Sequence, residues 1–198
     1  MTLPIRTIPI RLATAALLLA ACGRAPSTPA TAPDPRVPRE ILPASRLFVL
    51  EMSGIPPEDS IVTFPVTQPR VIILRHGAPD NTVFAELSFP DSVFWTDGGP
   101  DSVTVVVAPR PGVYALDLAM TIVPERGATI RFKYPVHFTA SLDAVERYGT
   151  AGRFERALSV GMLADGTNYA LLISLRPASD NLESALPGPG TYVVAAPR

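Results

Sequence analysis

The chain of 198 residues contains one cysteine, Cys22, two histidines and a single lysine, Lys133. One cysteine can form neither a disulfide within the chain nor a cysteine-rich metal site, so the stability of a fold must come from burial of apolar side chains. The basic residues form neither a cluster nor a stripe. The charge pattern therefore argues against nucleic acid as a partner.

Acidic residues are absent from the N-terminal part before Asp34. Arg6 and Arg11 precede an apolar segment, residues 12–21, which is too short to span a bilayer as a permanent helix. A basic start followed by a short apolar run is typical of an export signal, here residues 1–21. Its removal takes two of the 17 basic residues and leaves 15 against 18 acidic ones, a net charge of −3.

The apolar segment closes on Leu19-Ala20-Ala21-Cys22, which resembles the lipobox of bacterial lipoproteins at all four positions. The resemblance implies that Cys22 is diacylated and becomes the new amino terminus, which usually gains a third chain. Two or more acyl chains give stable anchoring, whereas one gives only marginal membrane residence. Gly23 in place of Asp implies, by the same resemblance, the outer membrane of the cell envelope. An ordinary secretory signal is the alternative interpretation.

Proline recurs every few residues between residues 22 and 43. Such a segment is expected to be an extended, semi-rigid tether that lifts the folded part off the membrane. Residues 44–198 then form the folded part, either one domain or two small ones divided near residues 123–128.

Proline and glycine also punctuate the folded part, and the segments between them are short and rich in Val, Ile, Phe, Leu and Thr, which predicts strands. Residues 113–122 alternate strictly between apolar and smaller or polar side chains. In residues 130–134, three apolar side chains alternate with Arg131 and Lys133. Asp165-Gly166 lies between residues 153–163 and 168–176, two apolar runs, and predicts a hairpin. Only residues 141–149 and 179–186 carry helix capping signals.

Two segments, Arg110–Leu116 and Gly188–Val194, share a Pro-Gly-x-Tyr motif before an apolar run. The motif predicts that each tyrosine buries its ring and bonds its hydroxyl to nearby backbone. It is similar to a motif found before late strands of bacterial immunoglobulin-like sandwich domains, and residues 127–138 faintly resemble ZU5-like sandwich modules. The fold class expected is an all-β, antiparallel immunoglobulin-like sandwich with one or two short helices.

Arg75-His76-Gly77 follows an apolar run and resembles the phosphate-accepting loop of histidine phosphatases, with Asn81 loosely matching a further polar position. That resemblance implies a second His-Gly pair and a parallel sheet flanked by helices. His137 is instead followed by Phe138, and the chain after Gly77 predicts strand after strand. A strand end and a turn are therefore the preferred interpretation.

Three further groups were weighed as sites. Asp97 and Asp101 share a glycine-rich loop that could hold Ca²⁺, although such loops are usually plain turns. The two histidines could meet and bind a metal, but no spacing pattern supports it, so no metal or other cofactor is expected. An aromatic cluster is weighed as core or as a binding surface, and it contains Phe84, Phe94 and Trp95.

The function expected is that of a membrane-anchored envelope lipoprotein with a non-catalytic binding or structural module. Its expected partners are the membrane, through Cys22, and another envelope protein or a polysaccharide. The alternative is a small extracytoplasmic hydrolase, in its sharpest form a histidine phosphatase that uses Arg75-His76-Gly77.

Overall fold

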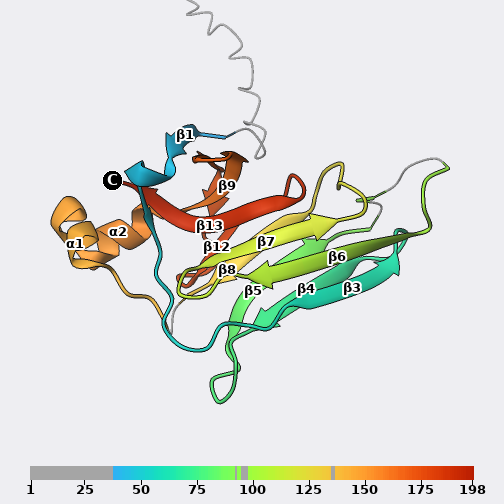
Figure 1. The fold of residues 1–198 in the computed structure, drawn as a ribbon, viewed down its shortest axis with the longest axis horizontal. Coiled ribbons are helices and arrows are strands. Elements are labelled where there is room, and N and C mark those ends of the chain that lie inside the picture. The colour runs from blue at the N-terminus through green and yellow to red at the C-terminus, as the bar shows by residue number, and fades with distance from the viewer. Residues whose placement is uncertain (1–37, 92, 95–97, 135–136) are drawn as a thin grey trace, which may run out of the picture. The chain divides into compact units, whose positions relative to one another are not determined.

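The computed structural model describes residues 38–198 except 92, 95–97 and 135–136 (Figure 1). The expected export signal and Cys22 lie outside these residues. Residues 40–43, which were expected in the tether, form strand β1 instead, because their backbone pairs with residues 168–171. Neither described α-helix has the length and apolar character needed to cross a bilayer.

The described strands form two antiparallel sheets (Figure 1). The first sheet has the order β1 (Glu40–Pro43), β10 (Asn168–Leu171), β9 (Ser159–Asp165), β13 (Gly190–Pro197), β7 (Ala115–Met120), β6 (Ser102–Pro109) and β3 (Ser60–Pro65), and β2 (Leu47–Val49) also pairs with β13. The second has the order β11 (Ser174–Leu175), β12 (Asn181–Ala185), β8 (Thr129–Lys133), β5 (Val83–Phe89) and β4 (Arg70–Arg75). The expected all-β antiparallel sandwich is confirmed.

The core lies between the two sheets and is built by the predicted period of two. In β7, Leu116 and Leu118 are buried, whereas Ala119 is exposed. In β8, Ile130 and Phe132 are buried in the same apolar cluster as the β7 leucines. The alternation read from residues 113–122 and 130–134 is therefore confirmed, and it directs both strands toward one shared core.

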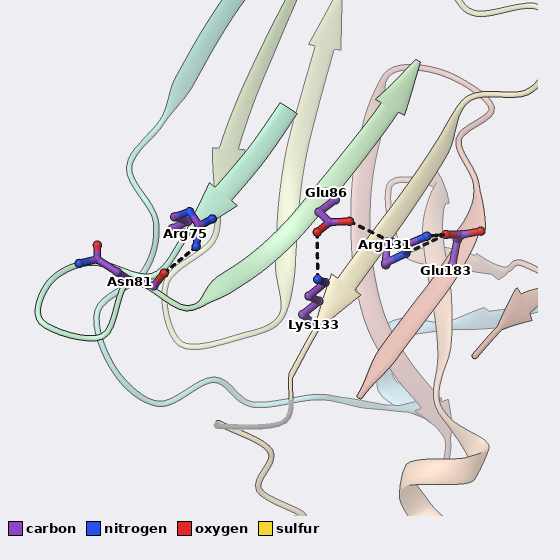
Figure 2. Close-up of polar contacts among 6 residues, drawn as sticks. All are labelled: Arg75, Asn81, Glu86, Arg131, Lys133 and Glu183. Carbon is purple, nitrogen blue, oxygen red and sulfur yellow. Dashed lines mark hydrogen bonds and ion pairs between the residues drawn. The ribbon is translucent and has the colours of Figure 1, made fainter. Parts of the chain in front are cut away.

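Outward-facing side chains of β8 form ion pairs with both neighbouring strands of the second sheet, β5 and β12. Arg131 donates to Glu86 of β5 through Nη1 (3.0 Å) and to Glu183 of β12 through Nε (2.8 Å). Lys133 lies 3.0 Å from the other carboxylate oxygen of Glu86. Figure 2 shows this ladder of alternating charges across the sheet. It compensates charges that are largely shielded from solvent.

The helical segments agree only in part with the sequence. Helix α1 (Leu142–Tyr148) begins where predicted, and the Ser141 side chain accepts a hydrogen bond from the Ala144 backbone N–H. Helix α2 (Ala151–Ala157) replaces the first half of a predicted strand. Thr150 caps its start, and Arg176 donates to the carbonyl oxygens of Glu155 and Leu158 at its end. A partner distant in sequence thus stabilises α2. One 3-10 turn, Ala44–Arg46, lies between β1 and β2.

The second predicted helix, residues 179–186, is wrong. Its residues form β12, which pairs with β8 on one side and β11 on the other. Leu182 and Ser184 are buried, while Glu183 faces outward to Arg131. Pairing in the sheet and the bond to Arg131 outweigh the local capping signal. The predicted hairpin at Asp165-Gly166 is confirmed, since it connects β9 to β10.

Replacing Arg131 with methionine leaves Glu86 and Glu183 facing each other without a shared cation. We expect the free energy of unfolding to fall by about 1–2 kcal/mol, measured by urea denaturation. Adding Glu183→Gln should recover part of the loss, because Glu86 keeps Lys133 and the charge left without its partner is that of Glu183. Arg70→Met, at an exposed position of β4, is the matched control. An Arg131→Met chain as stable as the control would contradict this account of the ladder.

Candidate functional site

His76 lies immediately after β4 and continues the inward face of that strand. Ile72, Leu74 and His76 alternate with outward residues, and the three are 4, 3 and 2% exposed. Arg75 points the other way, and its Nη1 donates to the Asn81 carbonyl oxygen over 3.0 Å (Figure 2). The Arg75-His76 pair is therefore split between the two faces of the sheet.

The turn that follows is held by backbone hydrogen bonds. The His76 N–H donates to the Thr82 carbonyl oxygen (2.9 Å), and the Gly77 N–H donates to that of Ile55 (3.0 Å). A Cβ on Gly77 would lie 2.4 Å from Cγ2 of Ile55, so only glycine fits this approach. The turn returns the chain so that Asp80 lies beside His76.

His137 completes the cluster from the far side of the sequence. Its Nε2 bonds the Asp80 carboxylate, and its Nδ1 lies 3.4 Å from the Ser53 hydroxyl. The imidazole rings of His76 and His137 have centroids 4.4 Å apart. One nitrogen from each ring and one carboxylate oxygen of Asp80 all lie within 4.8 Å of one another. Among the described residues this is the only group of three or more His, Asp or Glu side chains with that spacing.

Burial and charge set the protonation of the cluster. Burial lowers the pKa of the His76 imidazole below its usual value, and the neighbouring His137 lowers it further. Hydrogen bonding to the Ile55 backbone and the charge of Asp80 act in the opposite direction. The hydrogen bond from His137 lowers the pKa of the Asp80 carboxyl. These shifts favour a neutral His76 beside an ionised Asp80.

A cavity of about 210 Å³ adjoins the cluster, and two buried polar atoms beside it have no hydrogen-bond partner within the described part of the chain: Nδ1 of His76 and the hydroxyl of Tyr114. The cavity is lined by His76, Thr82, Val83, Tyr114, Lys133, His137 and Asp180. Burial also raises the pKa of the Tyr114 phenol, so this hydroxyl stays protonated.

The tyrosines of the two Pro-Gly-x-Tyr segments differ in the hydrogen bonding of their hydroxyl groups. Tyr192 behaves as predicted, because its hydroxyl donates to the Gly188 carbonyl oxygen over 2.6 Å. Tyr114 has the same local sequence and a fully buried ring, yet its hydroxyl makes no such bond. The prediction is wrong for Tyr114, whose polar end lies instead at the cavity beside His76.

The other described residues singled out in the sequence are not among the three polar groups of this cluster, although Phe84 packs edge-on against His76. Asp101 is exposed, and Asp97 and Trp95 fall outside the described residues. Phe84 and Phe94 are 0 and 1% exposed, so they belong to the core and offer no binding surface. Phe84 is the extra residue of a bulge opposite Leu74 and Arg75, which turns its ring inward onto that of Tyr114 (centroids 5.3 Å apart).

Sequence reasoning considered His76 and His137 as a pair but found no spacing to support it, and it missed Asp80. The only signal near Asp80 was its place in the Gly77–Asn81 turn directly after a buried strand end. The site therefore combines a β-sandwich with a His-Asp-His cluster at the end of an edge strand. Comparisons of the chain with protein-family models, with curated proteins and with solved structures found no match.

Gly77→Ala should destabilise the turn that carries Asp80, because the new methyl group collides with Ile55. We expect a loss of about 1–3 kcal/mol in the free energy of unfolding, measured by urea denaturation. Gly166→Ala is the control, since no atom lies within 4 Å of the added Cβ there. The double variant Gly77→Ala, Ile55→Ala should regain most of the loss, and equal stability of the two single variants would show the contact to be unimportant.

Proposed function

We propose that this chain is a membrane-anchored envelope lipoprotein whose sandwich is a non-catalytic module that binds an extended segment of another envelope protein. The lipobox ending at Cys22 supports the anchor, and the proline-rich segment after it supports a tether. The observation that carries the binding role is the free edge of β4.

Among the described strands, β4 pairs only with β5, so its other edge presents backbone donors and acceptors for a further strand. Its four central residues, 71–74, are all aliphatic. Val71 and Ile73 face outward and are 53 and 48% exposed. Exposed aliphatic side chains beside a free backbone edge are what an added strand recognises.

The other sheet edges are less suited to strand addition. Strands β1 and β3 end at Pro43 and Pro65, which lack an N–H donor, and β11 has only two residues. Strand β4 contains no proline and no charge between its terminal arginines, so two of the usual protections, proline and a central charge, are absent from it.

A groove of about 390 Å³ runs beside the end of β4. One wall is formed by Ile73, Leu74 and Arg75, and the other by residues 57–60, which include Glu58 and Asp59. An extended peptide along β4 would find apolar contacts in the middle and charged groups at this end. The groove therefore favours a peptide over a polysaccharide, because the described residues that line it include no Phe, Tyr or Trp on which a sugar ring could stack.

The arrangement around His76 gives the phosphatase alternative little support. Phosphoryl transfer requires several cationic donors around the nucleophilic imidazole. Arg75 lies on the opposite face and bonds Asn81. Of the described residues lining the 210 Å³ cavity, Lys133 is the only lysine or arginine, and it pairs with Glu86.

The proposal is tested by placing a photo-cross-linking amino acid at Ile73 in cells that make the lipidated chain. We expect one reproducible envelope partner, captured through an extended segment that mass spectrometry can identify. The same amino acid at Ile61, which is 72% exposed on β3, is the matched control and should not capture it.

The identified partner then allows a binding measurement with edge variants. We expect Ile73→Lys to weaken binding at least about tenfold, since a charge on this edge opposes strand addition, while Ile61→Lys leaves binding unchanged. Cys22→Ser should abolish capture in cells by mislocalising the chain, but not binding in solution. Capture that is equal at residues 61 and 73, or no capture at all, would refute strand addition at β4.

A further inference from the structure

In the cluster of His76, Asp80 and His137, not every buried polar atom has a hydrogen-bond partner among the described residues. His137 and Asp80 bond each other, yet Nδ1 of the buried His76 has no partner among the described residues. The Tyr114 hydroxyl beside it has none either. A buried polar atom without a partner is destabilising, so two of them beside one cavity favour a bound group there.

We infer that His76, Asp80 and His137 bind a divalent transition-metal ion, with Zn²⁺ as the best match. The three ligand atoms lie within 4.8 Å of one another, close enough for a small movement to bring them around a single ion. A Zn²⁺ ion bonded at about 2.0–2.2 Å to each of three ligands holds those atoms roughly 3–4 Å apart.

The ligand types select the class of metal. Two imidazoles and one carboxylate suit Zn²⁺ and similar first-row ions, whereas Ca²⁺ and Mg²⁺ prefer oxygen ligands alone. The described residues contain no cysteine, so the ligands that the structure brings together are two imidazoles and one carboxylate.

An outer contact orients the imidazole of His137 as in metal sites. The Ser53 hydroxyl lies at Nδ1 of His137, while Nε2 of the same ring bonds Asp80. Such contacts fix which ring nitrogen faces the ion. Gly54 also lies against the His137 ring, because a Cβ added to this glycine would be 3.3 Å from Cε1 of His137.

Three protein ligands leave a fourth position of a tetrahedral ion open. The cavity of about 210 Å³ beside the cluster has room for a water molecule or a small anion at that position. Tyr114 borders the same cavity, and its hydroxyl could donate to such a group. This inference does not depend on the proposed binding at β4.

The test is titration of the purified full-length chain with Zn²⁺ and Co²⁺. The chain carries Cys22→Ser and no polyhistidine tag, so neither a thiol nor a tag binds metal. We expect saturable binding of one Zn²⁺ per chain by calorimetry, a higher melting temperature with Zn²⁺, and the visible absorption of Co²⁺ in a site of low coordination number.

Asp80→Asn and His137→Gln each remove one ligand from partly exposed positions and should weaken Zn²⁺ binding at least about tenfold. Asp101→Asn, an exposed carboxylate away from the cluster, is the matched control and should bind as the parent does. His76→Gln tests the buried ligand where circular dichroism shows that the chain still folds.

The inference is overturned if the parent chain shows no saturable binding. It is equally overturned if Asp80→Asn and His137→Gln bind Zn²⁺ as tightly as the parent, or if Asp101→Asn weakens binding as much as they do. In those cases His76, Asp80 and His137 form a structural hydrogen-bonded cluster only.

Discussion

Packing of the two sheets across one aromatic core is the constraint on which the described structure depends. With a single cysteine, no disulfide supports it, and burial has to supply the stability. The stacked rings of Phe84 and Tyr114 join the second sheet to the first, and Phe132 packs edge-on against Phe84. His76 packs edge-on against the same two stacked rings, so the candidate site is an extension of the core itself.

Much of the fold could be predicted because sheet strands with one buried face show their period directly in the sequence. The segments at 113–122 and 130–134 are examples, and Asp165-Gly166 fixed a hairpin by turn chemistry alone. The errors occurred where partners distant in sequence decide the local structure. Arg176 stabilises the end of α2, and pairing with β8 makes residues 181–185 a strand despite a helix-like start.

The candidate site could be predicted much less well, for a related reason. Its ligands come from a strand end, from the turn after it and from a loop some sixty residues later, and only the sandwich brings them together. Local sequence could still have given one hint. Tyr114 and Tyr192 share a motif, but the acceptor of the Tyr192 hydroxyl is the carbonyl oxygen of Gly188, and Arg110 holds the equivalent position before Tyr114.

The site is largely formed by the protein before any ion binds, which distinguishes it from small metal-dependent folds. His76 is fixed by the alternation of β4 and by its backbone bond to Thr82, and Gly77 packs too closely against Ile55 for the turn to shift freely. A preformed site loses little entropy on binding, so most of the binding energy is available as affinity. The hydrophobic cluster between the sheets, meanwhile, is made of apolar and aromatic side chains and includes no metal ligand. An ion at this position would therefore serve the function of the sandwich rather than its folding, unlike the structural zinc of a chain that is unfolded without it.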